Sequence, residues 1–303
     1  MGKVNFDELK DKTKLVDEPA VKESFVNTLS KIHGVSTENA EMVFEREAMY
    51  FKKALFENAW LKESTGISLY SAFLEIAITG LSIQSGSKSE AYLEARSAKQ
   101  LIPVIGQDGK PYQQEQWTKV ARLVVTAYGE LNMRIIAGQI IRMNNPIVIY
   151  EGDKFQPKTN SRGELTVEYE PKIIGRSKKI VGVWCSIVLP NNGIDFKWLL
   201  EDDIQRLANY SKPKKENSSA SALYNSNDGQ IDPGFLEAKC IKHAMRAYTK
   251  LRLSDSVSFE EEETAAEETK EQRETTFAAQ GEEPQTVTVQ TQVPNEDDAD
   301  IPF

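Results

Sequence analysis

The sequence predicts an α+β fold, in which a central, mostly antiparallel sheet is flanked by helices and followed by a disordered acidic tail. Three observations lead to this fold class. Apolar residues recur at helical spacing before residue 65 and again after residue 232. Short β-branched segments separated by turn-forming residues fill the chain from about residue 90 to 200. Beyond residue 254 the chain is rich in Glu, Thr and Gln, a composition typical of disorder.

The N-terminal segment, residues 1–65, is predicted to be helical. Thr37 offers a helix start, because Glu38 and Glu41 follow it in the first turn. The apolar residues that come next recur on roughly one helix face: Val43, Ala48, Phe51, Leu55 and Ala59. A further helix is expected over Ser68 to Leu81, where Gly80 provides a stop signal.

Strands are predicted through the middle of the chain. The β-rich runs are Val120 to Val125, Gln139 to Tyr150 with a break at 144–146, Val167 to Pro171, Ile180 to Leu189 and Ile194 to Leu199. The tetrapeptide Pro190-Asn191-Asn192-Gly193 between the last two runs predicts a hairpin. A helix over Glu130 to Ala137 fits between the first two.

Helices are expected again at Glu201 to Ala208 and at Pro233 to Leu251. The stretch between them, Ser211 to Ile231, is rich in Ser, Asn, Lys and Gly and is interpreted as a mobile loop. The chain is thereby divided into a helical segment (1–65), an α+β core (66–254) and a disordered acidic tail (255–303).

Charge is distributed very unevenly along the chain. The overall net charge is -9, but residues 255–303 contain 15 acidic and 2 basic residues. Residues 1–254 contain 31 acidic and 35 basic residues and are therefore mildly basic. This asymmetry favours an anionic partner for the body and a tail that engages proteins.

The remaining composition indicates a cytoplasmic protein. Cys185 and Cys240 form no metal-spaced motif and are expected to be buried, inert thiols. The first residues are too polar for a signal peptide. The longest apolar stretch, Phe73 to Ile83, is interrupted by Glu75 and is too short to span a bilayer.

The predicted helix over Pro233 to Leu251 carries the most informative pattern in the chain. Asp232 is a ready N-cap and Pro233 suits the first helical position. At about 100° per residue, four cations fall within an arc of roughly 80°: Lys239, Lys242, Arg246 and Lys250. We interpret this basic stripe as a ladder of contacts to a phosphate backbone. An ordinary solvated helix face is the alternative.

A second group of cations lies between two predicted strands. It comprises Lys172, Arg176, Lys178 and Lys179, close in sequence to Tyr169 and Trp184. Aromatic side chains near cations could stack on bases, although most of these rings are expected in the core. Lys212, Lys214 and Lys215 add further charge in the expected loop.

The order of these features over residues 65–252 resembles the RecT family of phage and prophage annealing proteins. The matching segments are Thr79-Gly80-Leu81, Ala91-Tyr92-Leu93-Glu94-Ala95-Arg96, Tyr128-Gly129-Glu130-Leu131, Asp153-Lys154-Phe155, Pro171 through Ser186, and Lys242 through Ala247. The chain departs from the family in the last segment, where His243 and Ala247 replace the usual threonine and second arginine, and a preceding Pro-Trp is absent.

The resemblance implies a homo-oligomer, ring-like or helical, that holds single-stranded DNA and the annealed duplex in a basic groove and pairs strands without ATP, a metal or another cofactor. By this resemblance Lys242 and Arg246 contact phosphates, and Arg96, Arg176 and Lys178 are weaker candidates. We add Lys179 to these. The helices of residues 1–65 mediate contacts between protomers, and a partner exonuclease is a further candidate.

The last residues resemble the acidic tip of bacterial single-stranded DNA-binding proteins. Asp300, Ile301, Pro302 and Phe303 place an apolar hook and a terminal carboxylate at the end of an acidic tether. Such a hook can enter a hydrophobic pocket with a basic rim. We therefore expect this tip to bind host DNA repair proteins.

Two short segments of the sequence have features of other classes of function. Glu201-Asp202-Asp203 could bind a metal in a nuclease, but acidic residues are also favourable in the first turn of a helix. Gly106 to Pro111 lacks the Walker spacing of an ATP-driven motor. The sequence therefore predicts a non-enzymatic DNA binder without catalytic or metal-binding residues. A passive single-strand binder is the main alternative.

Overall fold

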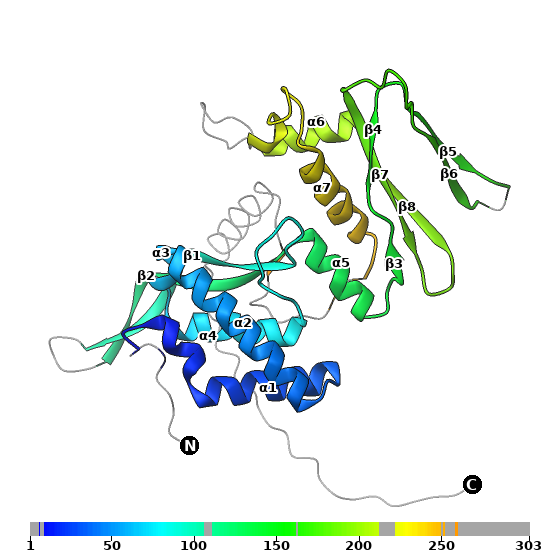
Figure 1. Cartoon of the computed structure of the whole chain (residues 1–303). Helices are drawn as coiled ribbons and strands as arrows, with labels where there is room; N and C mark the ends of the chain where they lie inside the picture. The colour runs from blue at the N-terminus through cyan, green and yellow to red at the C-terminus, as the bar shows by residue number, and fades with distance from the viewer. Residues whose placement is uncertain are drawn as a thin grey trace, which may run out of the picture. The chain divides into compact units, whose positions relative to one another are not determined.

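The structure of the chain is a computed structural model. It describes residues 6, 9–105, 111–161, 163–211, 222–249, 251 and 258–259. Helices and antiparallel strands alternate along these residues, so the predicted α+β class is confirmed (Figure 1). One central sheet was predicted, but the described strands form three separate sheets. Within the described ranges, none of the helices combines the length and apolar character that crossing a bilayer would require.

The first part of the chain is helical, as predicted. It contains a 3₁₀ turn η2 (Lys12–Asp17) and the helices α1 (Pro19–His33), α2 (Thr37–Glu57), α3 (Ala59–Lys62) and α4 (Gly66–Thr79). The cap of α2 is Ser36, one residue before the predicted start, because its side chain accepts a hydrogen bond from the Asn39 amide. Gly80 ends α4 in a left-handed conformation with φ of 69°.

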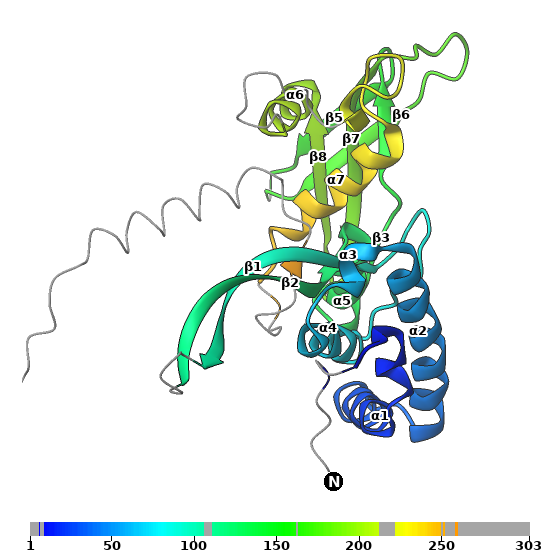
Figure 2. The same ribbon diagram turned by 90° about the vertical axis from the view of Figure 1, so that its left-hand side faces the viewer.

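A long hairpin follows these helices. Strands β1 (Ala91–Ile105) and β2 (Pro111–Val125) pair antiparallel over 15 residues each and form a curved ribbon (Figure 2). The sequence predicted only Val120 to Val125 of β2. The outer part was missed because Gln113 to Trp117 are exposed and polar apart from the tryptophan. They therefore lack the apolar alternation that marks a half-buried strand.

The first hydrophobic core lies between α1, α2, α4 and the base of this hairpin. Its centre is a group of packed rings, Phe25, Phe44, Phe51 and Phe73, with centroids 5.0–5.8 Å apart. Leu93 and Leu123 cover the same core from the hairpin. The apolar core thus runs across the predicted boundary at residue 65. The assignment of residues 1–65 to protomer contacts stays a prediction.

The middle of the chain contains a helix and the six strands that form the second and third sheets. Helix α5 (Ala127–Ile136) precedes β3 (Arg142–Met143), β4 (Ile147–Tyr150), β5 (Lys154–Thr159), β6 (Leu165–Glu170), β7 (Ile180–Val188) and β8 (Ile194–Leu200). Strand β7 is central, with β3 and β4 on one side and β8 on the other, all antiparallel. Strands β5 and β6 form their own hairpin. The predicted turn at 190–193 is confirmed by the bond from the Leu189 amide to the Gly193 carbonyl, 2.9 Å.

Helix α7 (Pro233–Met245) covers one face of the β4-β7-β8 sheet (Figure 1). The second core forms there, as Leu236, Cys240 and Ile241 pack against Val183 and Cys185. The predicted N-cap Asp232 accepts a hydrogen bond from the Phe235 amide, 2.8 Å. The two cysteines are buried and free, as expected, with their sulfur atoms 3.6 Å apart.

The predicted end of α7 is wrong: the helix stops at Met245 instead of Leu251. Contacts from α5 and β8 hold the residues that follow the helix. The buried Arg134 guanidinium donates a hydrogen bond to the Thr249 carbonyl at 3.0 Å, and Tyr248 donates to Asp195 at 2.9 Å. These contacts hold residues 248–249 away from a helical path.

Two further stretches differ from the predictions. Helix α6 comprises Glu201–Tyr210, and the next described element is a 3₁₀ turn, η3 (Ala222–Tyr224). Residues 222–231, expected to belong to a mobile loop, contribute Tyr224 and Ile231 to the second core. Ser258–Phe259 (β9), in the predicted tail, pair in parallel with the end of β2. Residues 212–221 and the rest of the predicted tail lie outside the described residues.

One glycine fixes how the two cores are joined. Gly129 lies in the first turn of α5, and a Cβ there would sit 2.0 Å from the Glu90 carbonyl oxygen. The Thr126 side chain caps this turn, accepting from the Gly129 amide and donating to the Ser89 carbonyl at 2.6 Å. The backbone just before β1 and the first turn of α5 therefore lie so close together that residue 129 has no room for a side chain.

Candidate nucleic-acid interface

A cleft of about 430 Å³ opens beside the base of the β1–β2 hairpin. Its walls come from β1, the residues just before it, the first turn of α5, the end of α6, η3 and α7. Three cations predicted from the sequence line this one cleft: Arg96, Lys239 and Lys242. Residues about 145 positions apart in the chain are thereby brought together.

The cations reach the cleft from opposite walls. Lys239 and Lys242 are half-buried on α7, one turn apart. The Lys239 ammonium lies 4.9 Å from the centre of the Phe235 ring, a favourable cation–π distance. From β1, Arg96 Nε contacts Glu94 at 2.8 Å. Glu94 also contacts Arg122 at 3.2 Å, so one carboxylate is shared between two guanidinium groups.

Aromatic side chains occupy the space between these cations. The cleft is lined by five rings, Tyr92, Tyr128, Tyr210, Tyr224 and Phe235. Tyr210 is 53 % exposed and Tyr92 is 39 % exposed, so both side chains are in part accessible to solvent. Tyr224 is buried and packs edge-on against Phe235, with centroids 5.2 Å apart. Exposed rings beside cations are the combination that binds single strands, since rings stack on bases and cations attract phosphates.

Charged groups surround the Tyr128 side chain, which lines the cleft. Burial raises the pKa of the Tyr128 phenol, and the negative charge of Glu237 raises it further. The Lys88 ammonium lies 5.7 Å from the Tyr128 ring centre and adds a cation that the sequence did not single out. The first turn of α5 also lines the cleft, and the partial positive charge of a helix N-terminus favours anions there.

Among the described residues, Arg246 of the predicted stripe does not line the cleft. Arg246 follows the last residue of α7 and is exposed. Lys250 lies outside the described residues. The predicted arc of four cations on one helix is therefore wrong beyond Met245, and only Lys239 and Lys242 keep that arrangement.

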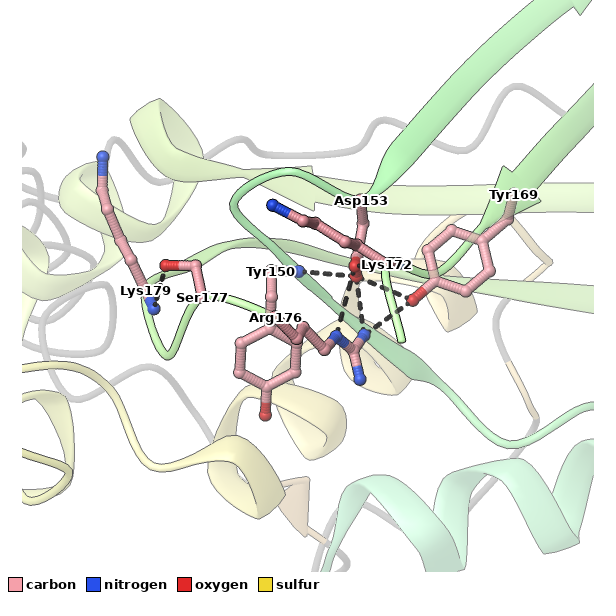
Figure 3. Close-up of polar contacts among 7 residues, drawn as sticks. All are labelled: Tyr150, Asp153, Tyr169, Lys172, Arg176, Ser177 and Lys179. Atoms are coloured by element: carbon pink, nitrogen blue, oxygen red, sulfur yellow. Dashed lines mark hydrogen bonds and ion pairs between the residues drawn. The ribbon is translucent and has the colours of Figure 1, made fainter. Parts of the chain in front are cut away.

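The second predicted group of cations lies on the loop between β6 and β7, which we call the basic loop (residues 171–179). Its Arg176 pairs with the buried carboxylate of Asp153, with Nη2–Oδ2 at 2.6 Å and Nε–Oδ1 at 3.2 Å (Figure 3). Lys179 lies 3.6 Å from Glu151 and 3.7 Å from Glu201. Lys178 is exposed. None of these residues lines the cleft, so the structure separates the predicted cations into two places.

Asp153 is the centre of a network that the sequence did not reveal. Besides Arg176, its carboxylate accepts hydrogen bonds from the amides of Tyr150 and Lys172 and from the Tyr169 hydroxyl, at 2.9–3.0 Å (Figure 3). Burial alone would raise the pKa of Asp153. The hydrogen bonds from Arg176, the two amides and Tyr169 outweigh it, and hold the pKa well below its ordinary value.

The aromatic residues near this loop are packed together. The Tyr169 ring lies 5.8 Å from Trp184, and Phe155 lies about as close to Trp184 and Trp198, at 6.1 and 6.0 Å. The segment Asp153-Lys154-Phe155 thus contributes an acid to the polar network and a ring to this cluster.

The acidic run at 201–203 forms the first turn of α6. Asp203 accepts a hydrogen bond from the Leu200 amide at 3.1 Å and pairs with Arg206 at 2.7 Å. In the described part of the chain, no three His, Cys, Asp or Glu side chains converge as metal ligands. The predicted partner-binding tip, residues 300–303, lies outside the described residues.

The sequence matches no protein-family profile, and a search of curated proteins finds no significant relative.

Proposed function

We propose that this chain is a RecT-type single-strand annealing protein. In this proposal it binds single-stranded DNA in the cleft between β1 and α7 and pairs complementary strands without ATP, during homologous recombination. It acts as a homo-oligomer. Its terminal residues 300–303 recruit host DNA repair proteins.

One observation carries the proposal: Arg96, Lys239 and Lys242 converge with exposed Tyr92 and Tyr210 around a single cleft. Cations on two walls can follow a phosphate backbone, while the rings offer flat surfaces to the bases. Contacts of this kind read no sequence. Sequence tolerance is what annealing of arbitrary strands requires.

The test compares full-length wild type with Lys239→Ala/Lys242→Ala. Binding to a fluorescent single-stranded oligonucleotide is measured at several salt concentrations, and pairing with its complement is followed without nucleotide. We expect at least a tenfold loss of affinity and slower pairing. Because each lost phosphate contact lowers the salt slope for single strands by about 0.7, the slope should fall by about 1.4.

The matched control is Lys154→Ala/Lys158→Ala, which removes the same charge from exposed positions on β5. Equal losses in both double variants would show that only net charge matters and would contradict the cleft. If wild type binds single strands but does not accelerate pairing, the chain is a passive single-strand binder instead.

A further inference from the structure

The tip of the basic loop presents two isoleucines to solvent. Ile173 is 86 % exposed and Ile174 is 88 % exposed, the highest values among the large hydrophobic side chains of the described residues. Removing an isoleucine side chain from water is favourable in folding and in binding. Two adjacent isoleucines left in water therefore indicate a surface that something else covers.

The loop is held in place at its base. The Asp153 carboxylate accepts from the Lys172 amide before the tip and from the Arg176 guanidinium after it (Figure 3). One buried group therefore closes the loop on both sides of the isoleucines. Gly175, with φ of 64°, completes the turn in a conformation that favours glycine. The Arg176 guanidinium also lies 4.3 Å from the centre of the Tyr150 ring.

The charge around the tip is positive. Within the described part of the chain, Arg176 and Lys179 have carboxylate partners, whereas no carboxylate forms an ion pair with Lys172 or Lys178. Both of these lysines are exposed. An aliphatic tip between two lysines is complementary to a partner that has an apolar slot between anionic groups.

We propose that Ile173 and Ile174 form a wedge that enters between adjacent bases of bound DNA, with Lys172 and Lys178 contacting the phosphates on either side. The inference rests on the proposed function. Aliphatic side chains are used in this way by DNA-binding proteins that unstack a base step. A base step flanked by two phosphates matches the arrangement of the loop.

The position of the loop supports nucleic acid as its occupant. Lys179 contacts Glu201 at the first residue of α6, and Tyr210 at the last residue of α6 lines the cleft. A helix of 10 residues is about 15 Å long. At about 3.4 Å per stacked nucleotide, a strand of four to five nucleotides spans this distance. A strand of this length would therefore reach from the cleft to Lys179, at the end of the basic loop.

The experiment uses single-stranded oligonucleotides that contain 2-aminopurine, whose fluorescence is quenched by stacking. At saturating full-length protein, we expect wild type to raise this fluorescence. Ile173→Ser/Ile174→Ser should lose at least half of the rise and bind about fivefold more weakly. Ile173→Leu/Ile174→Leu should retain the signal. The matched control is Ile135→Ser/Ile136→Ser, which changes another consecutive and exposed isoleucine pair.

The outcomes separate the wedge from the proposed function. If wild type does not bind single strands, the proposed function fails. If wild type binds and the serine variant gives the same rise in fluorescence, the wedge alone is overturned. Sedimentation with phosphatidylserine vesicles is run in parallel. Vesicle binding that the serine variant loses, with unchanged unstacking, would assign the loop to a lipid surface and overturn the wedge.

Discussion

The cleft and the basic loop contain the same kinds of residue and use them differently. In the cleft, Lys239 and Lys242 stand on a helix and face a cavity lined by rings. In the basic loop, Arg176 forms an ion pair with Asp153, and this pair holds the backbone of the loop in place. The cations of the cleft therefore line a cavity, whereas the pairing of Arg176 with Asp153 holds the loop in place.

This difference shows why cation counts along a sequence are a poor guide to binding. Arg176 and Lys242 both stand in short basic segments of the chain. Arg176 positions a loop because it pairs with the buried carboxylate of Asp153. The difference also gives distinct expectations for stability and for binding.

The largest expected effect is on stability, from Asp153→Ala. This change removes the acceptor of the Tyr150 and Lys172 amides and of the Tyr169 hydroxyl. It also removes the carboxylate partner of the Arg176 guanidinium. Leaving such donors without their acceptor costs about 1–3 kcal/mol, and the exposure of Arg176 reduces the contribution of the ion pair. The measurement is the free energy of unfolding in urea.

The control for this change is Asp17→Ala, which breaks only the exposed pair with Lys52. Exposed pairs contribute about 0–1 kcal/mol. The cleft variant Lys239→Ala/Lys242→Ala should also unfold close to wild type. An Asp153→Ala protein as stable as these two would contradict the structural role of the Arg176–Asp153 pair.

The next effect is on binding, from Tyr210→Ala. This ring is half-exposed at the edge of the cleft, and stacking of one base on an aromatic ring contributes about 1–3 kcal/mol. We expect a loss of affinity for single-stranded oligonucleotides of about 1–2 kcal/mol, or roughly 5- to 30-fold. Fluorescence anisotropy measures it.

Tyr210→Phe separates stacking from hydrogen bonding at the same position. The phenylalanine keeps the ring and should bind within about twofold of wild type, since stacking needs only the ring face. If both variants bind equally weakly, the hydroxyl and not the ring contributes, and the cleft does not use its aromatic residues as base platforms.

The features predicted correctly from the sequence depend on local chemistry. Asp232 and Pro233 start α7, Gly80 ends α4, and the 190–193 turn joins β7 to β8. Each involves a few neighbouring residues whose backbone preferences do not depend on the rest of the chain. The cations Arg96, Lys239 and Lys242, which line one cleft, were singled out from one helical stripe and one resemblance, and their role in binding DNA stays a prediction.

The features that were missed depend on contacts between distant segments. Arg134 ends α7 through Thr249, 115 residues further along the chain. The rings of the cleft come from separate segments, so no spacing in the sequence links Tyr92 to Tyr210 or Tyr224. The burial of Asp153 likewise follows from tertiary packing. A carboxylate next to a glycine and a lysine gives no local sign of it.

The smallest expected effect is a pH dependence that belongs to the loop and not to the cleft. The folded protein holds the pKa of Asp153 below the ordinary value, whereas the unfolded chain has an aspartate pKa of about 3.9. The unfolded state therefore binds the proton first as the pH falls. The resulting stabilisation is complete above about pH 5 and is lost as the pH falls through 4 towards the lowered pKa of the folded state.

Between pH 5 and pH 3, this one group should lower the free energy of unfolding by about 1 kcal/mol. Asp153→Asn removes the titrating group and keeps its size, so its stability should fall less than that of wild type over the same interval. Lys239→Ala/Lys242→Ala should follow the wild-type curve in parallel. Urea unfolding at pH 7, 5 and 3 measures all three. Parallel curves for wild type and Asp153→Asn would mean that the carboxylate is not held as an anion by the loop, and the wedge would then lack the anchor on which its rigidity depends.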